Sequence, residues 1–186
     1  MTDEDGQLEP VVKRGPPLVP RRTIRSDKGF PTRLFGRTGY NCGMITGIHH
    51  TGLATRDLDR LQEFYCRHFH GNVLTEFAWS TRDTELSQRL GFAQSAGRLC
   101  MLGFAATRLE IFEFAIPVIE RTTLRSVAAP GFSHIAFEVD DIDAEFDRLS
   151  AVMSFNAPPL KMSGGGIFAY GRDPDGNVIE LLQPPA

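Results

Sequence analysis

The sequence predicts an α+β fold made of two copies of a βαβββ module. The order strand, helix, strand, strand, strand occurs twice, over about residues 46–116 and 131–184. Each half begins with a strand that bears a histidine and ends with a strand that bears a glutamate, at offsets of 84 and 70 residues. Because each half alone is too small for a good hydrophobic core, we expect the two modules to pack together.

The first module is expected to begin with a strand over residues 47–55. A helix over residues 57–65 follows, because its apolar residues recur at helical spacing and Asp57 stands where an N-cap residue belongs. Residues 84–90 are polar with scattered leucines, which fits a short helix or an irregular loop. The other strands of this module are expected at residues 73–79, 98–104 and 108–114.

The second module repeats this order with a strand over residues 132–139 and a helix over residues 141–149. A weak strand near residues 152–155 and a loop with two prolines follow. The segment Asp173-Pro174-Asp175-Gly176 is expected to turn the chain, since proline fixes φ and glycine supplies a positive φ. The closing strands are expected at residues 167–172 and 177–183.

Residues 1–43 are interpreted as an N-terminal extension ahead of a single domain over residues 44–186. The extension carries five prolines and no sustained apolar periodicity, so we expect it to be flexible. It is either dispensable or it covers the active-site mouth or a partner subunit. It holds eight Lys/Arg and five Asp/Glu, whereas the domain is acidic. An acidic domain is a poor nucleic-acid binder, because contacts to phosphate dominate that affinity.

The composition also bears on where in the cell the protein is expected to occur. The chain of 186 residues contains no run of about 18 apolar residues, so no membrane span is expected. No short apolar stretch follows the N-terminus, so no secretory signal is expected. The three cysteines, Cys42, Cys66 and Cys100, show no paired spacing, which favours a reducing, cytoplasmic location over a disulfide scaffold.

Two histidines and two glutamates at equivalent places in the repeat form a candidate metal site. The four residues are His50, Glu110, His134 and Glu180. Imidazole nitrogens and carboxylate oxygens bind divalent transition metals, and four such ligands leave positions open for water or substrate. A histidine at a strand start is usually an ordinary polar residue, but both glutamates stand between apolar neighbours, where an unpaired carboxylate is costly. The repeat selects His50 over His49, because His49 aligns with Ser133.

Strand alternation places further residues on the faces of these ligands, two or four positions further along each strand. They are Ala54, Phe112, Phe114, Glu138 and Leu182. The two phenylalanines would make one wall of the cavity apolar, and Ala54 and Leu182 would complete the substrate-binding lining. Glu138 is a candidate general base beside the ligands, although a glutamate on a strand is more often a solvated residue.

Four motifs carry a resemblance to a known superfamily. They are His49-His50-Thr51-Gly52-Leu53 running into Asp57-Leu58-Asp59, Leu109-Glu110-Ile111, Gly131-Phe132-Ser133-His134-Ile135-Ala136-Phe137 running into Asp140-Asp141-Ile142, and Asp173-Pro174-Asp175-Gly176-Asn177-Val178-Ile179-Glu180-Leu181. Over about residues 46–184 the chain resembles the vicinal oxygen chelate superfamily. That superfamily includes glyoxalase I, methylmalonyl-CoA epimerase, extradiol dioxygenases, fosfomycin-resistance transferases and bleomycin-binding proteins.

The resemblance implies an incomplete eight-stranded barrel around one divalent metal ion. By resemblance, the metal ligands are His50, Glu110, His134 and Glu180. The resemblance does not choose among nickel, cobalt, manganese, iron, zinc and magnesium. It also implies a small-molecule substrate and a homodimer.

The His/Glu/His/Glu ligand set is most similar to glyoxalase I, which implies a lyase or isomerase that transfers a proton next to a metal-bound carbonyl. Glu180, Glu110 or Glu138 would take the proton. Glutathione-dependent members hold glutathione with a basic residue and an asparagine at the positions of Ala54 and Phe114, so a smaller or apolar, non-glutathione substrate is expected. The alternatives are an Fe(II) extradiol-type dioxygenase and a non-catalytic, ligand-sequestering protein like the bleomycin-resistance proteins.

Overall fold

The computed structural model describes residues 47–119, 123–124 and 126–185, and it confirms the α+β class with two βαβββ modules. The extension expected over residues 1–43 lies outside the described residues. The first module contains β1 (Thr51–Thr55), α1 (Leu58–Phe69), β2 (Asn72–Trp79), α2 (Thr84–Arg89), β3 (Ala96–Gly103) and β4 (Arg108–Ile116). The second contains β5 (Ile135–Glu138), α3 (Ile142–Leu149), β6 (Ser154–Phe155), β7 (Leu160–Lys161), β8 (Ile167–Arg172) and β9 (Val178–Gln183).

The elements differ from the expected ones mainly at their ends. Strands β1 and β5 begin at Thr51 and Ile135, so each candidate ligand histidine directly precedes its strand. The polar segment after β2 forms the short helix α2. Strand β7 is additional to the expected elements and is a ninth strand in the described part of the chain; it pairs antiparallel with β8. A strand of two residues has too few positions to show alternation in the sequence.

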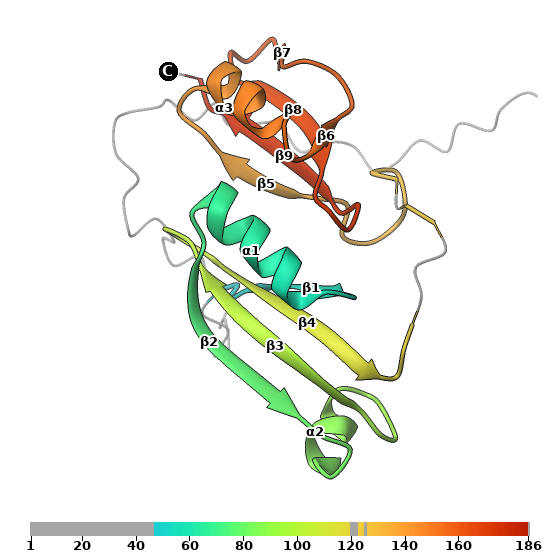
Figure 1. The fold of residues 1–186 in the computed structure, drawn as a ribbon. Helices are drawn as coiled ribbons and strands as arrows, with labels where there is room; N and C mark the ends of the chain where they lie inside the picture. The colour runs from blue at the N-terminus through green and yellow to red at the C-terminus, as the bar shows by residue number, and fades with distance from the viewer. Residues whose placement is uncertain (1–46, 120–122, 125, 186) are drawn as a thin grey trace, which may run out of the picture. The chain divides into compact units, whose positions relative to one another are not determined.

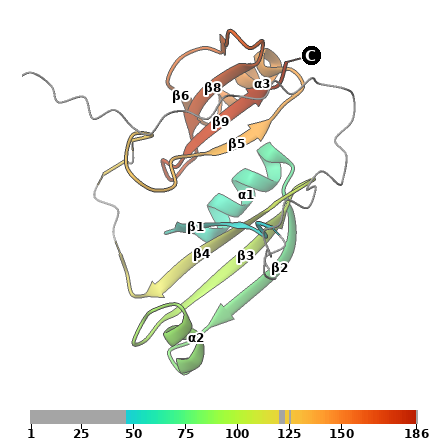
Figure 2. The same ribbon diagram turned by 180° about the vertical axis from the view of Figure 1, so that it is seen from behind.

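The strands form two sheets of equivalent topology. The first sheet has the order β1-β4-β3-β2, and the second has the order β5-β9-β8-β6 with β7 also paired to β8 (Figure 1). In each module the first and the last strand are parallel neighbours, whereas the other pairs are antiparallel. The view from behind shows β1 lying beside β4 and β5 beside β9 (Figure 2). The repeat in the sequence is therefore a repeat in strand pairing.

Helix α1 covers one face of the first sheet. Its buried residues Leu58, Leu61 and Tyr65 belong to the same core cluster as Ile111 of β4. The helix begins where the sequence indicates, because the Asp57 side chain accepts a hydrogen bond from the Arg60 backbone N–H at 3.1 Å. In the second module Asp141 caps α3 in the same way, through the Ala144 N–H at 3.1 Å. None of the described helices is long and apolar enough to cross a membrane.

The core continues from α1 into the second module. The rings of Phe69 and Phe137 have centroids 4.5 Å apart, and the Tyr65 ring stacks on Phe137. The Tyr65 hydroxyl donates a 2.9 Å hydrogen bond to the buried Asp173 carboxylate in the β8–β9 turn. Gly176 ends that turn at φ 77°, as the proline-glycine pattern predicts.

Candidate metal centre and the cavity beside it

The first pair of candidate ligands is His50 and Glu110, hereafter the first pair. His50 stands just before β1, and Glu110 lies on β4 opposite Gly52, so the parallel pairing of these strands brings the two side chains together. The His50 Nε2 atom lies 3.2 Å from Glu110 Oε2. The Glu110 side chain is 17% exposed and the His50 side chain 37%, so the pair is open to solvent on the imidazole side.

The second pair, His134 and Glu180, repeats this arrangement. His134 stands just before β5, and Glu180 lies on β9 opposite Ala136. The His134 Nε2 atom lies 3.0 Å from Glu180 Oε2. In both modules the glutamate pairs with the residue two positions after the histidine, so the two pairs are equivalent in register as well as in sequence.

The donor atoms of each pair fit a divalent metal ion. Two ligands bound at about 2.1 Å and at right angles lie about 3 Å apart, which is close to the nitrogen–oxygen separation in both pairs. The chain does not gather all four residues in one place, however. Among the described residues, no group of three or more His, Cys, Asp and Glu side chains could hold a metal ion. Each pair therefore supplies half of the expected ligand set.

The second ring nitrogen of each histidine faces the residue before it. His50 Nδ1 lies 2.9 Å from His49 Nδ1, and His134 Nδ1 lies 2.8 Å from the Ser133 hydroxyl. Arg108 contacts the other nitrogen of His49. These contacts hold both imidazoles with Nε2 turned toward the glutamate, as ligand histidines generally require.

The other residues expected beside the ligands lie on the expected strands. Glu138 is exposed at the end of β5, opposite Leu182 and two residues after Ala136, which stands opposite Glu180. Tyr170 of β8 stands opposite Glu180, and its ring lies edge-on to His134 with centroids 5.2 Å apart. Burial and the Glu180 carboxylate raise the pKa of Tyr170. Tyr170 carries no signal of its own in the sequence, although its position opposite Glu180 follows once the β8–β9 turn is placed.

An aromatic wall continues from Glu110 along the same face of β4. It consists of Phe112 and Phe114, stacked at 5.7 Å, with Trp79 of β2 edge-on to both rings. Phe92, which follows α2, packs on Phe114 at 5.5 Å. Trp79 and Phe92 could not be assigned to this wall from the sequence, because β2 and the segment after α2 join this face through long-range strand pairing.

A cavity of about 440 Å³ opens beside this wall. Its lining residues are Ala54, Thr55, Arg56, Arg60, Phe92, Phe114, Pro117, Ile119 and Asp175. Ala54 and Phe114 were both expected to line the substrate site, and both do line this cavity. Phe112 lies between the cavity and Glu110 on β4. Leu182 belongs to the other sheet and does not contribute to it.

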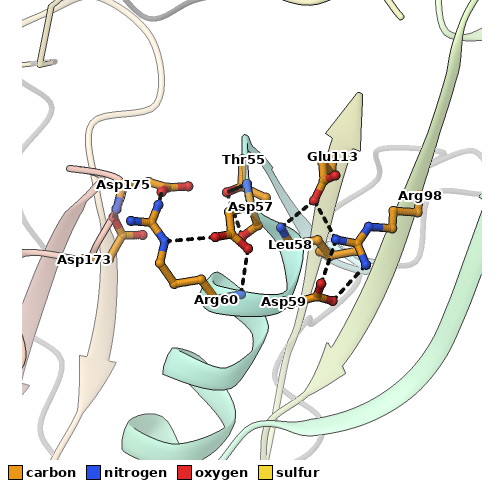
Figure 3. A network of polar contacts seen from close by, with 9 residues as sticks. All are labelled: Thr55, Asp57, Leu58, Asp59, Arg60, Arg98, Glu113, Asp173 and Asp175. Atoms are coloured by element: carbon orange, nitrogen blue, oxygen red, sulfur yellow. Dashed lines mark hydrogen bonds and ion pairs between the residues drawn. The ribbon is translucent and has the colours of Figure 1, made fainter. Parts of the chain in front are cut away.

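A network of charged residues fixes the start of α1 next to β1 and β4 (Figure 3). Glu113 of β4 accepts hydrogen bonds from the Leu58 backbone N–H at 2.6 Å and from Arg98 at 2.9 Å. Arg98 also makes two hydrogen bonds to the Asp59 carboxylate, at 2.8 and 2.9 Å. These bonds lower the pKa of Asp59 and raise that of Arg98. The network ties the start of α1 to β3 and β4, close to the end of β1 at Thr55.

The same junction reaches the second module. Arg60 forms ion pairs with Asp57 and with Asp175 (Figure 3). Asp173 accepts hydrogen bonds from the Asn177 side chain and backbone at 2.8 Å each. Burial raises the pKa of Asp173, although its hydrogen bonds act in the opposite direction. The β8–β9 turn, which leads into Glu180, is thus tied to α1 by two carboxylates.

Comparisons with known proteins agree with this architecture. A family model described as Glyoxalase/Bleomycin resistance protein/Dioxygenase superfamily matches residues 47–181. A probable lactoylglutathione lyase from Vibrio cholerae is 32% identical over 143 residues, which cover 73% of this chain and 89% of that protein.

Two solved structures share the fold at low identity. A glyoxalase family protein from Bacillus cereus matches with a TM-score of 0.71 and 17% identity, over 79% of this chain and 99% of that chain. The trypanothione-dependent glyoxalase I from Leishmania major matches with a TM-score of 0.50 and 24% identity, over 72% and 84% of the two chains. At these identities the likeness concerns the fold alone.

Proposed function

The chain belongs to the Glyoxalase/Bleomycin resistance protein/Dioxygenase superfamily, and from this premise we propose that it is a metal-dependent lyase or isomerase that moves a proton next to a carbonyl group. The observation that carries the proposal is the repeated histidine–glutamate pair, in which donor atoms stand 3.2 and 3.0 Å apart in equivalent strand registers. The relative from Vibrio cholerae, a probable lactoylglutathione lyase, supports a lyase over an oxygenase or a binding protein.

We propose that the complete site forms between two copies of the chain. The first pair of one copy would meet the second pair of its partner, so that each metal ion receives two imidazoles and two carboxylates. This arrangement accounts for two half-sets of ligands in a chain whose described residues contain no larger cluster. A closed dimer with twofold symmetry would then hold two identical sites.

A divalent ion held by His50, Glu110, His134 and Glu180 would act as a Lewis acid toward negative charge that develops beside a carbonyl. The carboxylates of the chain would carry the proton. Glu110 and Glu180 are the best placed, since both side chains are less than one-fifth exposed and lie within reach of an imidazole. Glu138 is the alternative base, placed beyond Glu180 on the neighbouring strand.

The substrate is proposed to be a small or apolar molecule other than a glutathione conjugate. The positions that hold glutathione in related enzymes are Ala54 and Phe114 here, and both line the cavity at the aromatic wall. Neither side chain can donate a hydrogen bond to a peptide-like substrate.

Mixing two inactive variants tests the shared site. Glu110→Gln and Glu180→Gln should each lose metal binding and activity as homodimers. In a mixed dimer, one of the two sites contains both substitutions and the other contains neither. Each mixed dimer should therefore regain about half of the metal binding and activity of the wild-type dimer. No restoration after verified subunit exchange would contradict a site built from two copies. The unmixed variants, each subjected to the same exchange step, are the controls.

The reaction class is tested by incubation of candidate 2-oxo acids and acyl thioesters with the metal-loaded enzyme in deuterated water. Proton transfer next to a carbonyl should introduce deuterium at the adjacent carbon. Oxygen uptake with catechols and no deuterium exchange would favour the extradiol dioxygenase instead.

A further inference from the structure

We infer that the cavity beside Phe114 binds a ring-sized apolar group and a carboxylate of the substrate, both remote from the reacting carbon. The inference rests on the proposed function in assigning this ligand to the substrate. The cavity itself, and the kind of molecule that fits it, follow from the residues that line it.

The apolar part of the ligand would pack on the aromatic wall. Phe114 lies at the cavity, and the rings of Phe92, Trp79 and Phe112 support it at centroid distances of 5.5, 5.4 and 5.7 Å. Trp79 is 6% exposed, and its ring nitrogen donates a 3.0 Å hydrogen bond to the buried Ser95 hydroxyl. The wall is therefore fixed in place, and a flat ring can stack on it without reordering side chains.

The space for that group exists because residue 54 is small. Ala54 stands opposite Phe112 in the β1–β4 pairing and lines the cavity. A volume of about 440 Å³ falls in the range of small-molecule sites. Thr55 is buried, and its hydroxyl is already engaged with the backbone of Asp57, at 3.0 and 3.2 Å. The lining thus favours apolar surface over a sugar or a peptide.

The charges around the cavity favour an anion. Among the described residues that line it, Arg56 and Arg60 are cations and Asp175 is an anion, so this described lining carries a net positive charge. Arg56 lines the cavity with an exposed side chain, and Arg60 lines it while forming an ion pair with Asp175. Arginine binds carboxylates through two parallel hydrogen bonds, which makes a carboxylate the matching group.

The position of the cavity sets the length of the ligand. Glu110 and Phe114 share one face of β4 and are four residues apart, which corresponds to about 13 Å along a strand. A molecule that reacts beside Glu110 and also fills the cavity is therefore extended. Its ring and its carboxylate serve recognition, while the proton moves at the other end.

Binding of three simple probes to the full-length protein tests the inference. Trp79 is the single tryptophan of the chain and contacts Phe114, so its fluorescence reports on the wall. Phenylacetate carries both the ring and the charge, acetate carries the charge alone, and phenylacetamide carries the ring alone. Phenylacetate should change the Trp79 fluorescence saturably and bind at least tenfold more tightly than either of the other probes, with calorimetry as a second measurement.

Variants assign the contacts. Arg56→Gln should weaken phenylacetate binding about tenfold and leave phenylacetamide binding unchanged. Ala54→Leu should weaken both aromatic probes, because it fills the cavity. Arg67→Gln, which changes an exposed arginine of α1 that pairs with Glu63, is the matched control and should change neither.

The outcome separates this inference from the proposed function. Equal binding of the three probes, or an Arg56→Gln variant that binds phenylacetate like the wild type, would overturn the inference even if the protein binds its metal. The titrations are repeated after treatment with a chelator. Retained phenylacetate binding in a protein that takes up no metal would refute the proposed metal enzyme and leave the cavity assignment standing.

Discussion

The Tyr65 hydroxyl and the Asp173 carboxylate form a buried 2.9 Å hydrogen bond that joins α1 of the first module to the β8–β9 turn of the second. Removing the hydroxyl leaves Asp173 without one of its donors inside the protein. Tyr65→Phe should therefore lower the free energy of unfolding by about 1–3 kcal/mol, measured by urea denaturation. Tyr170→Phe removes the same atom from a less buried ring and should cost less. Equal losses in the two variants would contradict a special role for the Tyr65 contact.

The ion pair between Asp59 and Arg98 gives a pH dependence with a definite sign. Hydrogen bonds from Arg98 lower the pKa of Asp59 below its ordinary value of 3.8. The folded protein therefore binds this proton less readily than the unfolded chain, so the pair stabilises the fold above pH 3.8 and the contribution is lost as the pH falls through the lowered pKa. At pH 6 the urea midpoint of unfolding should be higher for the wild type than for Asp59→Asn. The difference between the two midpoints should become smaller as the pH is lowered.

The control for that titration is the same substitution in an Arg98→Gln background. Without the guanidinium, Asp59→Asn should no longer produce a pH-dependent difference. If Asp59→Asn still changed the urea midpoint in a pH-dependent way in that background, Arg98 would not be the cause.

The two helix caps offer a matched pair of stability variants. Asp57 and Asp141 each accept a hydrogen bond at 3.1 Å from the backbone N–H three residues later. Asp57→Ala and Asp141→Ala should each cost about 1 kcal/mol of folding free energy. Asp57→Ala should cost more than Asp141→Ala, because Asp57 also forms an ion pair with Arg60. A smaller loss at residue 57 would show that this ion pair adds nothing.

The assignment of the base is open to a direct kinetic comparison. Glu138 is exposed, whereas Glu180 contacts His134. If Glu138 is the base, Glu138→Gln should lower kcat by about two orders of magnitude or more while the metal content stays near that of wild type. If Glu180 or Glu110 is the base, Glu138→Gln should leave kcat within a few-fold of wild type.

Much of the fold is readable from local patterns. The caps at Asp57 and Asp141, the helix periods and the Pro-Gly turn before β9 are local signals, and the structure follows them. Alternation also placed Glu110 and Glu180 on the faces of their histidines. Local patterns cannot show which segments that are distant in the sequence lie close together in the fold. Strand β7 is too short to show a period, and Trp79 joins the wall beside Phe114 only through pairing across β3.

The same limit applies to the candidate site. The offsets between the halves identified His50 with His134 and Glu110 with Glu180, and the shared register of the two pairs explains why those offsets exist. The sequence did not reveal that the chain keeps the pairs apart, because a repeat states which residues are equivalent and not how two modules face each other. It likewise did not indicate that Arg56 lies at the apolar cavity, since Arg56 follows β1 and has no strand position from which to infer its direction.

Metal stoichiometry tests the central claim most directly. After dialysis with nickel, cobalt, manganese, iron or zinc and removal of the free ion, elemental analysis of the purified protein should find about one metal ion per chain, since two pairs from different copies make one site. Glu110→Gln and Glu180→Gln should each abolish that binding, because both pairs serve the same ion. Less than about half an equivalent of every metal would contradict the metal centre, and two equivalents per chain, reduced to one by either substitution, would show two independent sites instead of one shared site.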